Sequence, residues 1–290
     1  MATTIPSAFD ILRDRLEITD LQAETVSTRQ SSVRDAVAAE MQIANSFLTG
    51  SYQRNTMIAP LKEADIDIFT VLGSDHHHYH SEANGHTNLL EAVKRVLLKR
   101  YPSTPKVSRS GQAVSITFTD FVVDVVPAFN RQGGGYLIPS TTAGRWIETD
   151  PTVHVRLSAE LNKAQNWKFV PLVKMIKAWN RNINHGFRSF YLELLARQIL
   201  LNVTITDYPS GIRYFFDKGR ELIPYIIKDP AFGDPVQGFD TVGTSEDAIS
   251  RFTTAYNRAL KAEEYAEKGY IADAIGEWRK ILGDYFPTYG

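Results

Sequence analysis

The chain has 290 residues, 43% of them hydrophobic, and no cysteine. This length suffices for one large core or two modest ones, and the lack of cysteine excludes disulfides and thiolate metal sites. A formal net charge of -1 argues against a protein that mainly coats nucleic acid. The sequence contains neither an apolar run of the roughly 18 residues that a membrane span needs nor an apolar signal-peptide segment, so we expect a cytoplasmic protein without a membrane contact.

The predicted elements change from mixed to helical along the chain. Alternating side chains predict strands, and apolar residues three and four positions apart predict helices. In chain order we expect helices within 8–46, strands at 47–49 and 65–72, a helix at 87–100, strands at 114–118 and 121–129, and helices at 171–179, 189–201 and 245–282. This change of pattern predicts a mixed α/β domain at residues 1–155 and a helical domain at residues 156–290.

Three aspartates interrupt the predicted strands of the first domain. Asp65 and Asp67 lie two residues apart, so both carboxylates project from one face of their strand. Asp124 interrupts the apolar run from Phe121 to Val126, where an unpaired charge would be costly. Three carboxylates on neighbouring strands would form an oxygen site for Mg²⁺. For Asp65 and Asp67 alone, a strand that faces solvent at the edge of the sheet is the alternative.

A glycine and a serine precede the first acidic strand. Gly50 permits close approach of the backbone, and the Ser51 hydroxyl can hold a phosphate oxygen. Together with the aspartates, this turn predicts nucleotidyl transfer by in-line displacement. Two Mg²⁺ ions, for which Mn²⁺ can substitute, would bridge the carboxylates and a triphosphate. Asp124 would hold the metal nearer the attacking hydroxyl and help to take its proton.

Three further groups of residues have both a functional and an ordinary interpretation. Five histidines between His76 and His86 match no metal-ligand spacing, so we expect a solvated loop there. The six Lys and Arg residues from Lys94 to Arg109 could touch nucleic acid or a phosphate, but a charged outer helix face is more common. Lys174 and Lys177 lie one turn apart; one of them could reach a triphosphate, or both are ordinary surface lysines.

Several of these segments resemble a known superfamily. The polymerase-β-like nucleotidyltransferases have core motifs similar to GSYQRNT, ADIDIF and VDVVPAF of this chain. The helical half of the cyclic GMP–AMP synthase and oligoadenylate synthetase branch resembles LVKMIKAWNRNINHGFRSFYLELL, and the bacterial cyclic-oligonucleotide synthases of anti-phage systems resemble the chain most. The similarity extends from about residue 30 to the end. It implies an α/β (α+β) bilobed fold, in which a nucleotidyltransferase core with a small mixed sheet faces a C-terminal helical lobe across the active-site cleft.

The resemblance also implies roles for residues of the first lobe. Gly50 and Ser51 match the phosphate-binding turn of the superfamily. Asp65, Asp67 and Asp124 match its catalytic, metal-binding triad.

Residues of the second lobe match nucleotide-binding positions. Lys177 matches a lysine that contacts the donor triphosphate, Ser189 a serine that holds the same nucleotide, and Phe190 a position whose ring stacks on a base. The zinc-stapled insertion of the animal DNA sensors has no counterpart, because the chain has no cysteine, and DNA sensing through zinc is therefore not expected.

The resemblance implies an ATP-binding or other NTP-binding enzyme that makes a cyclic di- or trinucleotide second messenger, releases pyrophosphate and serves bacterial anti-phage defence. A regulatory partner protein and a downstream effector that binds the product would belong to such a system. Three alternatives stay open: a linear-product transferase of the oligoadenylate or RNA-tailing kind, an enzyme that transfers AMP to a protein or small molecule, and a nucleotide-binding scaffold without activity.

Overall fold

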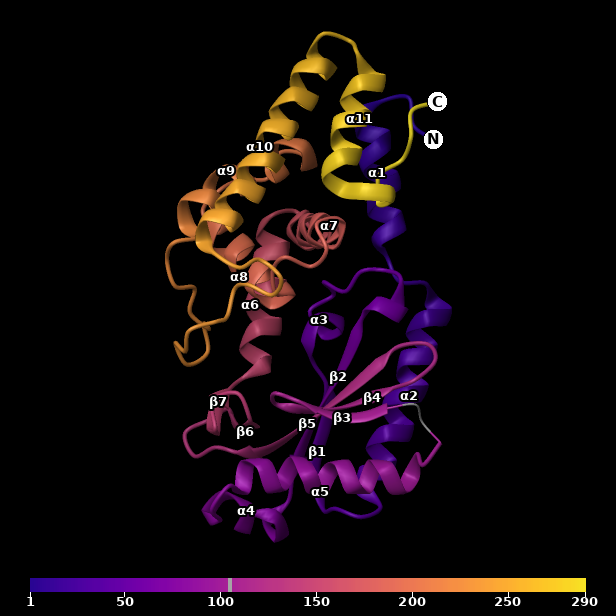
Figure 1. Ribbon diagram of the computed structural model, residues 1–290. Helices are drawn as coiled ribbons and strands as arrows, with labels where there is room; N and C mark the ends of the chain where they lie inside the picture. The colour runs from indigo at the N-terminus through magenta and orange to yellow at the C-terminus, as the bar shows by residue number, and fades with distance from the viewer. Residues whose placement is uncertain (104–105) are drawn as a thin grey trace. The chain divides into compact units, whose positions relative to one another are not determined.

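A mixed β-sheet with helices on one face forms one of two units in the computed structural model, which describes residues 1–103 and 106–290 (Figure 1). Contacts group Ile18–Val155 into this sheet unit, and Met1–Glu17 with Arg156–Gly290 into a helical unit. The prediction that residues 1–155 form one domain therefore needs a correction, because the first seventeen residues pack with the helices of the second half.

The sheet unit contains all seven described strands and the helices between residues 18 and 150. Its elements are α2 (Asp20–Ala38), β1 (Ile43–Leu48), α3 (Gly50–Gln53), β2 (Asp65–Leu72), α4 (His78–Ser81), α5 (Gly85–Arg100), β3 (Lys106–Ser110), β4 (Ala113–Thr117), β5 (Val122–Asn130), β6 (Tyr136–Ser140) and β7 (Arg145–Thr149). Helix α6 (Pro151–Ala164) begins in this unit and continues into the helical one.

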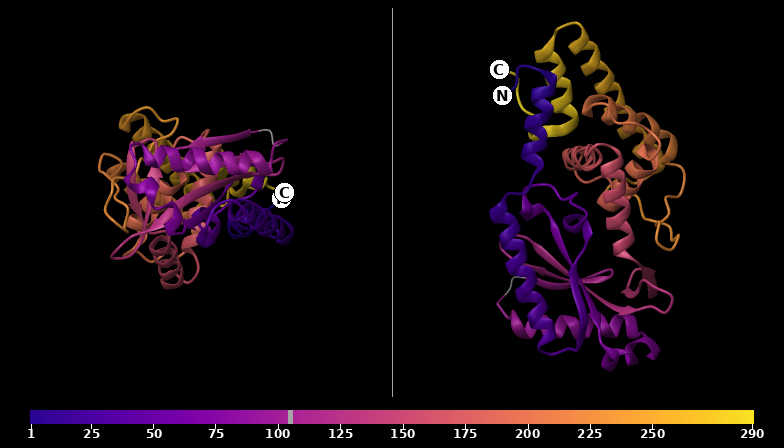
Figure 2. Two further views of the ribbon diagram at one scale, coloured as in Figure 1. Left: turned by 90° about the horizontal axis from the view of Figure 1, so that it is seen from below. Right: turned by 180° about the vertical axis from the view of Figure 1, so that it is seen from behind.

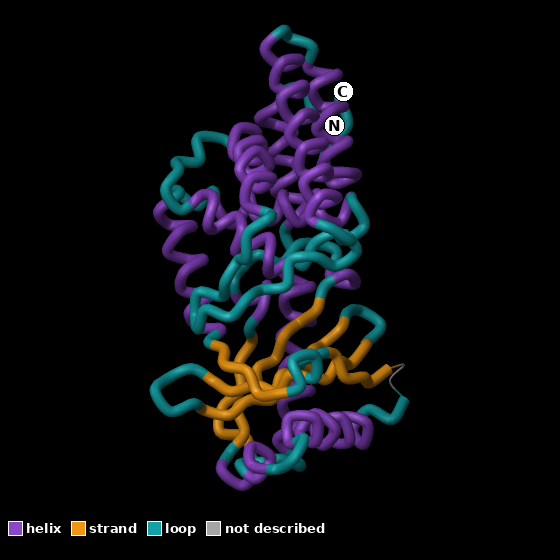
Figure 3. The backbone as a smooth tube through the Cα atoms, turned by 60° about the vertical axis from the view of Figure 1, so that its left-hand side comes forward, coloured by secondary structure: helices purple, strands orange, loops and turns teal. Residues whose placement is uncertain are grey.

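The strands form a single mixed sheet, which Figure 3 shows in orange. Its order is β1-β2-β5-β4-β3, and β6 pairs with the end of β5 and with β7. Among the described strand pairs, β2 and β5 run parallel and the others antiparallel. The predicted small mixed sheet is confirmed, although strands β3, β6 and β7 were not predicted.

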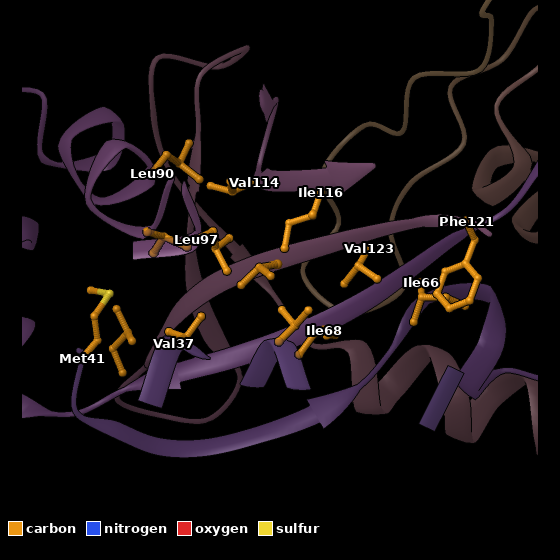
Figure 4. Packing of buried hydrophobic residues seen from close by; sticks show 14 of the residues in the cluster. Val37, Met41, Ile66, Ile68, Leu90, Leu97, Val114, Ile116, Phe121 and Val123 are labelled. Carbon is orange, nitrogen blue, oxygen red and sulfur yellow. The ribbon is translucent and has the colours of Figure 1, made fainter. Parts of the chain in front are cut away.

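One face of the sheet is apolar along β2, β5 and β4 and supports the core of this unit. Ile66 and Ile68 of β2 and Val123 and Val125 of β5 are each 0% exposed, and they pack against α2 and α5. Figure 4 shows side chains of β2, β4 and β5 meeting those of α5 in this cluster. Alternation along the strands then directs the intervening residues of β2 and β5 to the opposite face.

The helical unit is built around buried aromatic rings. Its helices are α1 (Ile5–Leu16), most of α6, α7 (Phe169–Asn182), α8 (Ser189–Leu200), α9 (Tyr208–Leu222), α10 (Ser245–Glu267) and α11 (Ile271–Leu282). The Trp179 ring lies 4.8 Å from that of Phe216 and 5.0 Å from that of Phe252, in edge-to-face contacts. Within residues 1–103 and 106–290, every helix is too short or too polar to cross a membrane.

Helix α1 belongs to the helical unit because its apolar side chains pack there. The ring of Phe9 meets Trp278 of α11 at 5.1 Å and Phe286 at 5.0 Å. The two ends of the chain also lie side by side, with a parallel bridge between Ala2 and Tyr289 (Figures 1 and 2). These contacts join positions more than 260 residues apart, so no local pattern in the sequence indicated them.

Two glycines inside helices provide a matched test of this packing. A Cβ at Gly219 of α9 would lie 2.3 Å from the Phe252 ring, whereas a Cβ at Gly276 of α11 would meet nothing within 4 Å. We expect Gly219→Ala to destabilise the protein by about 1–3 kcal/mol through overpacking. Gly276→Ala should stabilise it by about 0.5–1 kcal/mol, because alanine favours a helix. Denaturant unfolding of both variants measures this, and equal effects would contradict the packing described.

Candidate active site

The three predicted aspartates lie on one face of the sheet, on the adjacent strands β2 and β5. The parallel register places Asp65 beside Val122 and Asp67 beside Asp124. Residues paired in register project to the same face, as do residues two apart on one strand. Three carboxylates therefore share the face opposite α5. Since β2 lies between β1 and β5, the alternative of an acidic edge strand is wrong.

The protein surroundings disfavour the negative charge of two of these carboxylates. Burial raises the pKa of Asp124, although a hydrogen bond with Ser115 on β4 opposes the shift. Asp65 is exposed at the start of β2. Even so, partial desolvation, and after it the charge of Asp124, raises the pKa of Asp65 to about 6. A nearby cation would stabilise the ionised form of both carboxyl groups.

The donor set fits a hard divalent cation such as Mg²⁺. The Oδ1 atom of Asp124 is buried and has no hydrogen-bond partner among the described residues. Such an oxygen is costly to leave unpaired and suits a metal ligand. In the described part of the chain, no three Asp, Glu or His side chains lie close enough together to hold a metal ion in their present rotamers. Like charges repel, so carboxylates without a cation favour rotamers that keep them apart.

The predicted phosphate-binding turn packs directly against the acidic face. Gly50 has φ +65°, and a Cβ on it would lie 1.7 Å from Oδ2 of Asp67. The neighbouring backbone N–H of Thr49 donates to the Asp67 carbonyl oxygen at 2.9 Å. Both the conformation and the close approach require glycine at this position. Ser51, the next residue, begins its helical turn beside Asp67 and is half-buried.

Lys174 and Lys177 are buried, at 2% and 5% exposure. The alternative that they are ordinary surface lysines is therefore wrong. The Nζ atom of Lys174 lies 2.6 Å from Glu17, and that of Lys177 lies 2.6 Å from Glu193. Both side chains of the second pair are buried, at 6% and 7% exposure. A buried ion pair does not in general stabilise a fold more than apolar residues would, so its presence favours a role in positioning charge.

The remaining predicted nucleotide contacts lie on α8. Ser189 is exposed at the first residue of α8, and Phe190 is half-buried beside it. Glu193, the ion-pair partner of Lys177, follows Ser189 by four residues. Glu193 and Ser189 therefore lie on one side of the helix. Glu193 was not predicted as a functional residue. It interrupts the apolar run FYLELL in the same way that Asp124 interrupts its own apolar run. The nucleotide contacts of Lys177, Ser189 and Phe190 stay predictions.

The histidine segment is solvent-exposed as predicted at His77, His78 and His80, but it forms short helical turns rather than a loop. A short 3-10 turn (Ser74–His76) and α4 interrupt it. The ring of His77 packs edge-on to Phe129 at 5.3 Å, and that of His80 lies 5.7 Å from Trp146. No group of metal ligands forms there among the described residues, and the rings of His77 and His80 contact β5 and β7 while staying exposed.

Acidic residues on two adjacent strands of a mixed sheet, with a glycine turn against them, characterise the polymerase-β-like nucleotidyltransferases. The profile of one family, described as the Second Messenger Oligonucleotide or Dinucleotide Synthetase domain (SMODS), matches residues 3–162. This is more than half of the chain, and the protein belongs to this family. It is accordingly an enzyme, a nucleotidyltransferase.

Similar proteins carry related descriptions. A cyclic AMP-AMP-AMP synthase of Acinetobacter sp. is 27% identical over 98% of this chain and 86% of its own length. The structure of Escherichia coli MS115-1 CdnC with ATP has a TM-score of 0.72 at 18% identity, and covers 98% of this chain and 99% of its own. CdnC in complex with HORMA-deltaN has a TM-score of 0.70 at 18% identity, over 96% of each chain.

The raised pKa of Asp65 predicts that the free energy of unfolding decreases when this carboxyl group loses its proton. Because its folded-state pKa of about 6 exceeds the ordinary 3.8, the folded protein binds this proton more tightly and loses stability as the pH rises from about 4 to about 6. Asp65→Asn removes that loss. After allowance for solvent screening, we expect this variant to gain on the order of 1 kcal/mol at pH 7.5 in EDTA, or about 2–4 °C in Tm.

Asp120→Asn is the matched control for this measurement. Asp120 forms an ion pair with Arg29 at 3.1 Å, so its carboxylate is balanced and its loss should leave stability unchanged or lower it by less than about 1 kcal/mol. Thermal unfolding of the three proteins at pH 4.5, 6 and 7.5 gives the comparison. A stability of the wild type that does not fall relative to Asp65→Asn with rising pH would contradict the prediction.

Proposed function

We propose that this nucleotidyltransferase joins NTPs through phosphodiester bonds and closes them into a cyclic di- or trinucleotide second messenger in bacterial anti-phage defence. The in-register placement of Asp67 beside Asp124 carries the proposal, because it gathers three carboxylates beside a glycine turn. The family description names second messenger synthesis, and the similar Acinetobacter protein is called a cyclic AMP-AMP-AMP synthase.

The acidic face supports a mechanism of in-line displacement. Asp65, Asp67 and Asp124 would hold two Mg²⁺ ions, replaceable by Mn²⁺, which neutralise charge on the triphosphate. A 2′- or 3′-hydroxyl oxygen attacks the α-phosphorus, the bond from this phosphorus to the bridging oxygen breaks, and pyrophosphate leaves with the electron pair. Asp124 helps to accept the hydroxyl proton.

The turn at Gly50 and Ser51 would bind the triphosphate beside these carboxylates. Gly50 leaves room next to Asp67 that any side chain would fill, and Ser51 offers a hydroxyl and a backbone N–H to phosphate oxygens. Little covalent chemistry is asked of the chain itself. Position and charge neutralisation therefore supply most of the rate.

ATP is the substrate that the comparisons favour. The similar synthase is named for three AMP units, and CdnC was solved with ATP. CdnC was also solved with HORMA-deltaN, which supports a regulatory partner protein for this chain as well. A cyclic product would act by binding a downstream effector.

A turnover assay tests the reaction. The protein is incubated with labelled NTPs and Mg²⁺ or Mn²⁺, and the products are treated with phosphatase and identified by mass. We expect a phosphatase-resistant species of two or three nucleotides. Asp65→Asn with Asp67→Asn should lower its formation by about a thousandfold or more, while Asp120→Asn keeps activity within a few-fold. Phosphatase-sensitive chains would instead identify a linear polymerase, and full activity of the double variant would contradict the acidic site.

The buried lysine of α7 gives a separate prediction about substrate affinity. If Lys177 contacts the triphosphate, Lys177→Met should lower kcat/KM about 10- to 100-fold, mainly through KM, because a charge-assisted contact is worth about 1.5–3 kcal/mol. Combining it with Glu193→Gln avoids leaving an unpaired buried carboxylate, which would itself destabilise the fold.

The control for this variant lies one turn away on the same helix. Lys174→Met with Glu17→Gln removes an ion pair of the same 2.6 Å length at a lysine to which the family resemblance assigns no nucleotide contact. We expect the control pair to change the unfolding temperature and leave KM unchanged. Equal KM values in both double variants would assign Lys177 a structural role only.

A further inference from the structure

A polar surface cavity of about 560 Å³ lies at the edge of the sheet, at β3. It is lined by Thr87 and Lys94 of α5, Ser108 and Arg109 of β3, and Thr141 after β6. None of these residues has a large apolar side chain, and two carry positive charge. Figure 1 shows α5 running beside β3, and these two elements supply four of the five lining residues.

Lys94 is a half-buried cation without a balancing group. In the part of the chain that the structure describes, its ammonium forms no ion pair and no side-chain hydrogen bond, although it is partly removed from water. By contrast, Lys99 on the same helix is exposed and lies 2.6 Å from Glu40. A partly desolvated charge without a partner is unfavourable, and an anion in the cavity would remove that cost.

Arg109 is held in place and keeps donors available. Its Nε lies 2.8 Å from a carboxylate oxygen of Glu91, which fixes the guanidinium against α5. Its two terminal nitrogens make no hydrogen bond with the described residues. The planar guanidinium can therefore present these donors to a phosphate, for which its geometry is suited.

The other polar groups of the cavity are also suited to an anion. The hydroxyls of Thr87 and Ser108 make no hydrogen bond with described residues and are free to donate, whereas that of Thr141 already donates to the Gly111 carbonyl at 2.9 Å. Thr87 lies in the first turn of the sixteen-residue helix α5, whose N-terminal end carries partial positive charge. With Lys94, Arg109 and Glu91 ionised, the local formal charge is +1.

We propose that this cavity binds a small phosphate-bearing anion, either the phosphates of a nucleotide or inorganic pyrophosphate. The site is separate from the acidic face, because β4 lies between β3 and β5 and because Lys94 and Glu91 belong to the helix that covers the opposite face. Its cations attract the anions that the three carboxylates repel. The proposal does not depend on the nucleotidyl-transfer reaction.

Calorimetric titration of the full chain with pyrophosphate in EDTA tests this site without any catalytic readout. Without a metal, the acidic face repels pyrophosphate, so heat from that site is avoided. Lys94→Met removes the unbalanced charge. Arg95→Met is the matched control, because it removes one charge from the next residue of the same helix, which is exposed and outside the cavity. Lys94→Arg keeps the charge and tests rescue.

We expect the wild type to bind pyrophosphate with a Kd of about 0.1–1 mM, as a few charge-assisted contacts permit. Lys94→Met should weaken binding about tenfold or more, while Arg95→Met and Lys94→Arg stay within about threefold. Absence of wild-type binding up to about 10 mM, or equal losses in Lys94→Met and Arg95→Met, would overturn the proposal.

A parallel titration with ATP and AMP identifies the source of the phosphate. Tighter binding of ATP than of pyrophosphate, lost in Lys94→Met, supports a nucleotide as the ligand. Tighter binding of pyrophosphate, lost in the same variant, supports the inorganic anion. Binding of either probe that is unchanged in Lys94→Met places it elsewhere and contradicts the site.

Discussion

The in-register parallel pairing of β2 with β5 is the constraint on which the candidate active site depends. Ile66 lies beside Val123 and Ile68 beside Val125, and all four are buried against α2 and α5. A slip of one residue would turn Asp124 into this core and one row of valines out of it. The apolar face therefore fixes which residues meet on the other face. The hydrophobic core thus excludes the one-residue shifts that would move Asp67 and Asp124 to opposite faces of the sheet.

The helical unit uses buried charge in a different way. Two lysines of α7 find carboxylates on different elements, Glu17 after α1 and Glu193 on α8. Each ion pair ties α7 to one neighbour in a single orientation, since a displaced lysine would be left buried and unpaired. Glu17 remains 45% exposed, whereas Glu193 is 7% exposed. The second pair therefore depends much more on its partner, and its ammonium is held more firmly.

The sequence predicted features that break a local pattern and missed those that need distant partners. Asp65, Asp67 and Asp124 were identified because carboxylates are rare inside strands, and the helices after residue 151 because their periodicity is strong. Burial of Lys174 could not be predicted, because Glu17 lies 157 residues away. The same holds for α1, which joins the helical unit through the contact of Phe9 with Trp278. The ring contacts of His77 with Phe129 and of His80 with Trp146 could not be predicted either, because both partners lie on later strands.

A polar row crosses the sheet and links the acidic residues with the cationic edge. Asp67 pairs with Asp124, Asp124 with Ser115, and Ser115 with Ser108, so four neighbouring strands each contribute one polar residue to the same face. Further along that face, Phe69, Val71, Val126 and Ala128 are apolar and buried. The row begins with carboxylates that favour a cation and ends at Ser108 in the cavity with Lys94 and Arg109. Three strand spacings, about 14 Å, separate Asp67 from Ser108, and two, about 10 Å, separate Asp124 from Ser108. Exposed charges separated by more than the Debye length of about 8 Å are largely screened in physiological salt, so the acidic end and the cationic end can each bind a ligand of opposite charge independently of the other.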